Sequence, residues 1–318
     1  MIEKEKLEDY SISSSVKPQT SALNKIGIIG CGSMGQDIAL LISSHGIDVV
    51  FIEISNARVK EAFDELNTKL DGMINRWGLT AGEKRAVLSR IKGNTDYAVL
   101  KKCGIVIECI SSHGYEKSVI SIKQEIFRKI EQVVSPTTII ATNSSTIVIS
   151  ELASVLKYPE RAIGIHFLSP ANTVRIVEIE RSLKTSEEAF ETVKKFVRTI
   201  DKKIITVNES PGNISTRLVI PLINEACELY MEGVASIEDV DETMKLGYGM
   251  QLGPFEMADK IGLDKLDMWM DNLYDEFGDR KFKSSPLIKK LVRAGRLGRI
   301  AGQGFYNYSS GKKLSTKI

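Results

Sequence analysis

Three glycines stand at the spacing G-x-G-x-x-G in the segment Gly30-Cys31-Gly32-Ser33-Met34-Gly35. This segment follows the apolar run 25–29, which is typical of a buried parallel strand, and precedes a helical pattern over 37–44. In such a unit the first glycine permits a tight turn, the second lets the backbone approach a pyrophosphate, and the third lets helix and strand pack closely. The pattern predicts a dinucleotide site that uses Gly30, Gly32, Ser33, Met34 and Gly35.

Glu53 ends the second apolar run, 49–53, which completes a strand–helix–strand unit. A carboxylate at that strand end accepts hydrogen bonds from the ribose hydroxyls of NAD and repels the 2′-phosphate of NADP. Arg58 is the nearby basic residue that would favour NADP instead. The acidic side chain at the strand end therefore predicts NAD as the cofactor.

His166 and Glu178 have the side chains that proton transfer requires. His166 follows 163–165 at the end of a predicted strand, and ligands bind at the carboxyl ends of strands in open α/β sheets. Glu178 continues an apolar face of the run 174–179, where a buried carboxylate needs a partner. A carboxylate beside the histidine fixes its tautomer and raises its basicity, which suits a general base. A purely structural His–Glu pair and a solvent-facing glutamate are the alternatives.

Small polar side chains follow another predicted strand, 138–142, in the segment Asn143-Ser144-Ser145-Thr146. Their hydroxyl groups could hydrogen-bond a substrate oxygen, and they could equally cap the helix that follows. The residues alone leave both interpretations open.

A sheet is needed to bring these side chains together, and the chain predicts one. Further apolar runs at 105–110 and 162–167 indicate buried strands, and helical patterns alternate with the strands. One long helical pattern covers 59–74, and Thr80-Ala81-Gly82-Glu83 has the form of a capping box for the next helix. The alternation predicts an α/β fold, with a Rossmann-like, mostly parallel sheet and helices on both faces.

The pattern changes after Val207, where Ser210-Pro211-Gly212 interrupts the chain. Beyond it we find only helical periodicity, over 214–231 and in segments opened by Ser236, Pro254 and Pro286. We therefore expect a loose extension over 1–22, an NAD-binding domain over 23–209 and an all-helical domain over 210–318.

Composition and charge exclude several classes of protein. The net charge of +2 gives no reason to expect nucleic acid or a membrane surface as partner. No apolar run approaches the ~18 residues of a transmembrane helix, and the charged N-terminus does not resemble a signal peptide. The four cysteines lack metal-binding spacing and fit reduced thiols. We expect a cytoplasmic protein without a metal site.

From about Lys25 to Tyr308 the chain resembles the L-3-hydroxyacyl-CoA dehydrogenase family. The matching motifs include the glycine turn and the segments that carry Ser145, His166 and Glu178. Further matching motifs lie in the second half, namely Lys245-Leu246-Gly247, Gly253-Pro254-Phe255-Glu256, Gly295-Arg296-Leu297-Gly298-Arg299 and Gly302-Gln303-Gly304-Phe305-Tyr306.

The resemblance implies an active site in a cleft between the Rossmann-like domain and a helical domain that forms a homodimer. It implies that His166 takes the substrate hydroxyl proton while hydride leaves the same carbon for NAD. Glu178 would orient and support His166, Ser145 would hydrogen-bond the reacting oxygen, and Asn143 would contact the cofactor. The substrate implied is an acyl thioester of coenzyme A.

The chain departs from the family at the substrate and nicotinamide end. Thr216 stands where the family usually has an asparagine that helps hold the acyl substrate. Our hypothesis is that Asn213, three residues earlier on the same predicted helical face, partly replaces it. Ser169 stands where the family usually has another polar side chain, an asparagine, near the substrate. Ser112 stands near the position of a Glu-Asn pair that the family commonly has at the nicotinamide ribose.

These departures leave the substrate more open than the reaction. The same chemistry on an acyl carrier protein thioester or on a free hydroxy acid is one alternative. A non-catalytic NAD-binding protein is another, and intact Ser145, His166 and Glu178 count against it. A hydroxyisobutyrate-type dehydrogenase would carry a catalytic lysine in a long central helix, and 214–231 contains no lysine.

Overall fold

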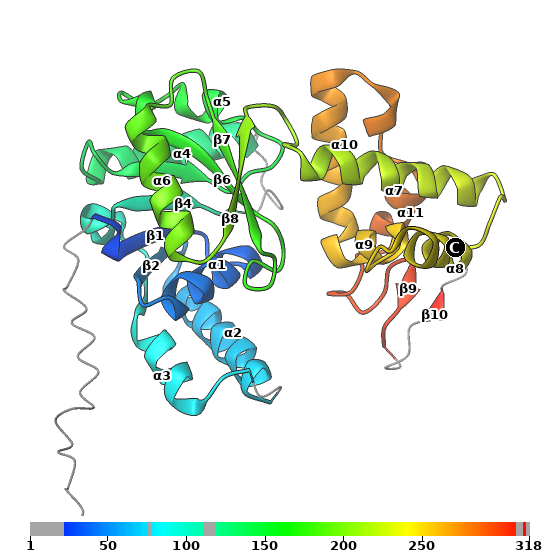
Figure 1. The fold of residues 1–318 in the computed structure, drawn as a ribbon, viewed down its shortest axis with the longest axis horizontal. Coiled ribbons are helices and arrows are strands. Elements are labelled where there is room, and N and C mark those ends of the chain that lie inside the picture. Colours follow the sequence, from blue (N-terminus) through cyan, green and yellow to red (C-terminus); the bar gives the residue numbers. More distant parts are fainter. Residues whose placement is uncertain (1–21, 76–77, 111–118, 310–313, 316–318) are drawn as a thin grey trace, which may run out of the picture.

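The computed structural model describes residues 22–75, 78–110, 119–309 and 314–315 (Figure 1). Apart from Ala22, the predicted N-terminal extension lies outside these residues, and so does Ser112. The described chain forms a sheet with packed helices, followed by a mainly helical part that lies beside it (Figure 1).

An eight-stranded sheet carries the first part of the chain. Its neighbouring strands are all parallel except β6 and β7, which run antiparallel. Most strand residues are buried, as expected for a sheet covered on both faces. In spatial order the strands are β3 (Ile91–Asn94), β2 (Asp48–Ile52), β1 (Lys25–Ile29), β4 (Ile105–Glu108), β5 (Ile139–Thr142), β6 (Ala162–Phe167), β7 (Ile176–Arg181) and β8 (Lys203–Asn208).

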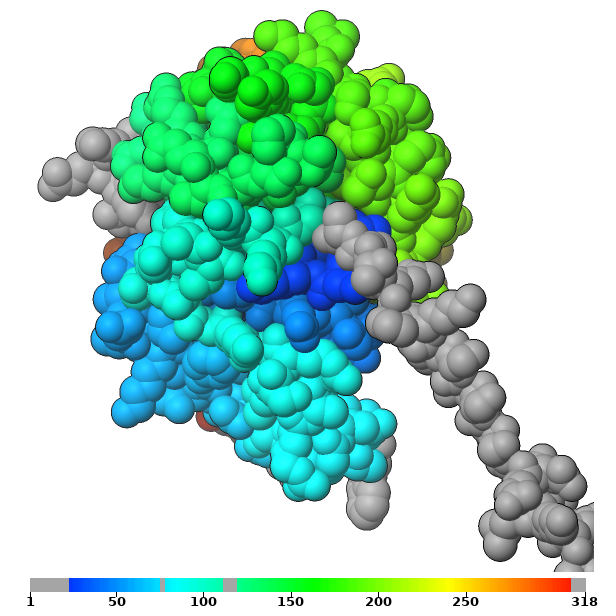
Figure 2. All heavy atoms as spheres, turned by 90° about the vertical axis from the view of Figure 1, so that its left-hand side faces the viewer, coloured from blue at the N-terminus to red at the C-terminus, as the bar shows by residue number. Residues whose placement is uncertain are grey.

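Helices cover both faces of this sheet, as the sequence predicts. One apolar core packs the sheet against α1 (Ser33–Ser44), α2 (Asn56–Asn75), α3 (Ala81–Ser89) and α6 (Glu187–Thr199). The core of the other face includes α4 (Val119–Val133) and α5 (Ile149–Ala153). Helices α2 and α3 extend below the sheet, and α3 forms the protruding lower end in Figure 2. Short 3₁₀ turns occupy Ala22–Asn24, Tyr97–Lys102, Pro159–Arg161 and Arg280–Phe282.

The second part has an apolar core of its own. Its helices are α7 (Ser215–Met231), α8 (Ile237–Glu242), α9 (Pro254–Ile261), α10 (Leu263–Phe277) and α11 (Pro286–Arg293), with a π-helical turn at Thr243–Gly247. The short strands β9 (Tyr306–Asn307) and β10 (Leu314–Ser315) pair antiparallel at its end. Among the described helices of the whole chain, none has the length and apolar character that crossing a membrane requires.

The structure confirms the predicted fold class and also contains elements that the sequence analysis missed. The capping box at Thr80 and Glu83 opens α3, as predicted. Strand β3 was missed because it contains a lysine and a glycine, and β8 because it is a partly exposed edge strand. The single helix expected after Pro254 is two helices, because the chain breaks at Gly262 with φ of 100°. The strand pair β9–β10 is an exception to the expectation of an all-helical second part.

A buried ion pair fastens α4 to the sheet. The Nζ atom of Lys123 lies 2.6 Å from each carboxylate oxygen of Glu108, and both side chains are almost fully buried. The same carboxylate accepts hydrogen bonds from the hydroxyl of Thr142 and the backbone N–H of Ile110. Because both carboxylate oxygens of Glu108 have partners, its negative charge is tolerated at the carboxyl end of β4.

We predict that Lys123→Met destabilises the protein by about 3–5 kcal/mol, because it leaves the Glu108 charge buried without its cation. The double variant Glu108→Gln/Lys123→Met should recover most of this loss. Lys129→Met is the matched control, since the pair of Lys129 with Glu125 on the same helix is half-exposed and contributes at most about 1 kcal/mol. Denaturant unfolding measures all three, and equal losses for Lys123→Met and Lys129→Met would refute the prediction.

Candidate active site

The glycine turn adopts the geometry that a bound pyrophosphate requires. Gly30 has φ of 86°, which is in the left-handed region that favours glycine. A Cβ atom on Gly35 would overlap the carbonyl oxygen of Gly30, whereas one on Gly32 would meet no atom within 4 Å. The backbone at Gly32 is thus open to an approaching phosphate, next to the amino end of α1. The residues present fit a dinucleotide at this turn.

Glu53 lies against the same turn. Its Oε1 atom accepts a hydrogen bond of 2.7 Å from the N–H of Cys31, and its Oε2 atom accepts one of 3.2 Å from Ile54. A carboxylate has about four acceptor sites, so both oxygens can still accept ribose hydroxyls. Arg58 forms an ion pair of 2.5 Å with Glu61, so its charge is engaged on α2.

His166 and Glu178 are brought into direct contact. They lie opposite one another in the antiparallel ladder of β6 and β7, and His166 Nδ1 is 2.7 Å from Glu178 Oε2. Their exposed fractions are only 6% and 1%. The partner that the sequence analysis expected for a buried Glu178 is therefore present in the structure.

Ser215, which was not among the predicted site residues, contacts the same carboxylate. It is the first residue of α7; its backbone N–H donates to Glu178 Oε1, and its hydroxyl donates to Oε2, each at 2.9 Å. Burial alone would raise the pKa of Glu178, but the hydrogen bonds from His166 and Ser215 outweigh it and hold that pKa below its ordinary value. The serine near the start of a predicted helix was the available signal.

Two loops meet at the carboxyl end of β6. The side-chain oxygen of Asn143 accepts a hydrogen bond of 2.9 Å from the N–H of Phe167, the residue after His166. The carbonyl of the buried Ser145 accepts a hydrogen bond of 2.7 Å from Gly212, in the segment just before α7. The loop that carries Asn143 and Ser145 thus lies between the sheet and the start of the second part.

Asn213 and Thr216 are both buried, but they do not share a helical face as expected. Asn213 precedes α7 and has φ of 47°, in the left-handed region that an asparagine tolerates. Both polar atoms of its amide are buried without a hydrogen-bond partner among the described residues. Ser169 lies exposed in the turn between β6 and β7.

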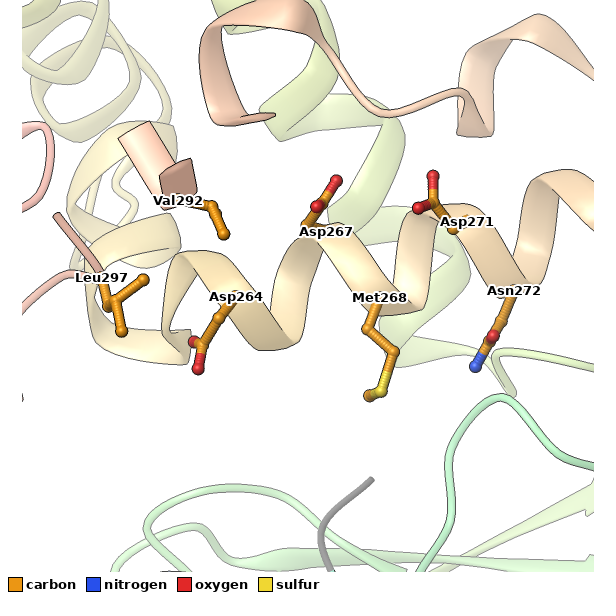
Figure 3. A pocket seen from close by; sticks show the side chains of 7 residues that line it. All are labelled: Asp264, Asp267, Met268, Asp271, Asn272, Val292 and Leu297. Carbon is orange, nitrogen blue, oxygen red and sulfur yellow. The ribbon is translucent and has the colours of Figure 1, made fainter. Parts of the chain in front are cut away.

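A hollow runs along α10, and its lining consists of Asp264, Asp267, Met268, Asp271, Asn272, Val292 and Leu297 (Figure 3). Asp264, Met268 and Asn272 point to one side of α10, while Asp267 and Asp271 point to the other and hold Lys289. The hollow does not contain His166. Its edge is fixed by a hydrogen bond of 2.9 Å from the amide of Asn272 to the hydroxyl of Thr146, the residue after Ser145.

Comparison with known proteins accounts for both parts of the chain. The family model of the 3-hydroxyacyl-CoA dehydrogenase NAD binding domain matches residues 25–210, and the model of the C-terminal domain matches residues 212–308. The chain belongs to the 3-hydroxyacyl-CoA dehydrogenase family. It is an NAD-dependent oxidoreductase that acts on a CH–OH group.

Known relatives of this dehydrogenase match it over nearly their full length. A 3-hydroxybutyryl-CoA dehydrogenase of Clostridioides difficile is 36% identical over 285 residues, which are 90% of this chain and 99% of that protein. The structure of (S)-3-hydroxybutyryl-CoA dehydrogenase PaaH1 from Ralstonia eutropha is 39% identical with a TM-score of 0.80, over 90% of this chain and 99% of that one. The structure of FadB2 from M. tuberculosis is 29% identical with a TM-score of 0.86, over 91% and 100%.

This dehydrogenase also buries a second carboxyl group beside Glu178. Glu180 lies two residues further along β7, is 2% exposed, and has one side-chain oxygen without a partner among the described residues. It stands opposite Gly164, whose missing side chain leaves room for it. Burial, together with the charges of Glu209 and Glu178, raises the pKa of Glu180 to about 8, although it accepts a backbone hydrogen bond from Ile149.

The raised pKa of Glu180 predicts how stability depends on pH. The carboxyl of the unfolded chain loses its proton near its ordinary pKa of 4.5, and that of the folded protein keeps it to about pH 8. Between these values the folded state binds more protons, so stability falls as pH rises, by up to about 1.4 kcal/mol for each pH unit. Glu180→Gln resembles the protonated form and should lose less stability across that window.

Unfolding free energies of the native protein and Glu180→Gln, measured at a series of pH values between about 5 and about 8, test this prediction. Because the other titrating groups are common to both proteins, the difference between the two curves isolates Glu180. Curves that stay parallel would refute a raised pKa at this position.

Proposed function

We propose that this dehydrogenase oxidises the 3-hydroxyl group of a 3-hydroxyacyl-CoA, and reduces the 3-keto group in reverse, with His166 as general base. The observation that carries the proposal is the buried contact of His166 with Glu178 at the carboxyl end of β6. Relatives named as 3-hydroxybutyryl-CoA dehydrogenases over nearly their full length support the substrate class.

The contact defines the task of each side chain. An ionised Glu178 accepts the Nδ1–H of His166, which leaves Nε2 with the lone pair that takes a proton from the substrate hydroxyl. The negative charge of Glu178 also favours the imidazolium that forms. When bound, NAD supplies the acceptor for the hydride that leaves the same carbon. The low pKa of Glu178 supports this assignment, because the carboxylate stays ionised at neutral pH.

Residues around the pair would hold the two reactants. In this proposal the ribose and pyrophosphate of NAD lie against Glu53 and the glycine turn that includes Ser33 and Met34, and Asn143 lies at the nicotinamide end. Ser145 hydrogen-bonds the reacting oxygen. The buried amide of Asn213 has free donors and acceptors for the acyl group. Thr216, three residues further along the chain, would also contact the substrate. The role proposed for Ser112 falls outside the described residues, and Ser169 would contact the substrate from its exposed turn.

The proposed division of labour follows the two parts of the chain. Residues 23–209 bind NAD, and residues 210–318 bind the acyl chain and form the homodimer. Large exposed apolar side chains in the second part, including Leu218, Leu246 and Tyr248, support a protein contact there.

The test follows NADH absorbance with acetoacetyl-CoA, with the same acyl group on acyl carrier protein, and with free hydroxy acids. We expect turnover at an ordinary enzymatic rate with acetoacetyl-CoA. His166→Gln should retain NADH binding, measured by fluorescence, and lose about a hundredfold to ten-thousandfold in kcat. Turnover only on a carrier-bound or free substrate would overturn the coenzyme A assignment. Unchanged kcat in His166→Gln would remove His166 as the base.

A further inference from the structure

Ser215 sits where the two parts of the chain meet. Strand β8 ends at Asn208 and α7 begins at Ser215, so this residue opens the second part (Figure 1). The segment before it is tied to the sheet side by the hydrogen bond from Gly212 to the carbonyl of Ser145. The start of α7 is thereby held against the amino-terminal half of β7, where Glu178 lies opposite His166.

The hydrogen bonds at Glu178 divide unequally between its oxygens. Oε1 accepts the backbone N–H of Ser215, and Oε2 accepts both the Ser215 hydroxyl and Nδ1 of His166. The two donors on α7 and the one on β6 together restrain rotation of the carboxylate. The amino end of α7 adds a partial positive charge next to the negative carboxylate.

We propose that Ser215 is a positioning residue, through which α7 sets the orientation of Glu178 and so of the base His166. This inference rests on the function proposed above, because it assigns Ser215 a task only if His166 transfers the proton. The other contacts described between the two parts, from Gly212 to Ser145 and from Asn272 to Thr146, do not reach Glu178. The position of the second part relative to the sheet therefore affects the orientation of His166 through Ser215 and Glu178.

The hydroxyl and the backbone N–H make separable contributions. Ser215→Ala removes the hydroxyl and keeps the N–H. The carboxylate then keeps two of its three hydrogen bonds, from the Ser215 N–H and from His166, and is held less firmly. Ser215→Thr keeps a hydroxyl at the same position. A positioning role predicts loss in the first variant and rescue in the second.

We expect Ser215→Ala to lower kcat about tenfold while KM for the acyl substrate and NAD stays unchanged, because an ill-placed base slows the chemical step and not binding. Ser215→Thr should restore kcat. Ser186→Ala is the control, since it also removes a serine hydroxyl at the start of a helix, α6, and Ser186 lies beside Glu160, before the amino end of β6 and away from His166. This control should lower the unfolding midpoint without lowering kcat.

A second readout needs no turnover. We expect the Nδ1–H proton of His166 to give a proton NMR resonance that the hydrogen bond to Glu178 protects from exchange, and its loss in His166→Gln would assign it. Ser215→Ala should broaden this resonance through faster exchange with water, and Ser215→Thr and Ser186→Ala should retain it.

The two readouts separate this inference from the proposed function. One outcome is that the native protein turns over none of the substrates while Ser215→Ala still loses the resonance. That result would uphold the positioning role of Ser215 and reject the proposed function. A native protein active on acetoacetyl-CoA, with kcat and resonance both unchanged in Ser215→Ala, would overturn the positioning and uphold the function. A fall in kcat that Ser186→Ala reproduces would also overturn it.

Discussion

The almost completely buried carboxylate of Glu178 constrains the rest of the candidate active site. Removing such a charge from water is costly, and it is tolerated only where hydrogen bonds and a complementary charge surround it. One donor comes from His166 across the β6–β7 ladder and two come from Ser215 at the start of α7. The reversal of direction between β6 and β7 and the docking of α7 both serve this requirement, because neither donor lies next to Glu178 in sequence.

The cofactor end obeys a different and more local requirement. A pyrophosphate needs close approach of the backbone and free N–H groups, and both come from the consecutive residues Gly30 to Gly35. Glu53 lies at the end of the next strand and hydrogen-bonds the turn itself. Since one short segment meets these needs, the proposed NAD site could be predicted from the sequence. The pair at His166 instead requires the pairing of two strands and a helix from the second part.

This difference explains what could be predicted. Strand and helix periodicity were enough for the fold class, and the glycine spacing together with Glu53 was enough for NAD, because those signals lie within one strand–helix–strand unit. Contact between His166 and Glu178 could be inferred because a charge on an apolar strand face demands a partner. A serine near the start of a predicted helix is too common a signal to single out Ser215, and the burial of Glu180 depends on which atoms the tertiary fold places beside it. The break at Gly262 was missed because a single glycine inside a periodic segment is an ambiguous signal.

In the proposed function, the charge of Glu178, held in place by its three donors, makes His166 an effective base. The most direct test is the rate of NADH formation in a single turnover by Glu178→Gln with 3-hydroxybutyryl-CoA. Glutamine keeps the shape of the side chain and removes its charge. We expect a rate at least about a hundredfold lower than that of the native protein, with NADH affinity unchanged. A rate equal to that of the native protein would contradict it.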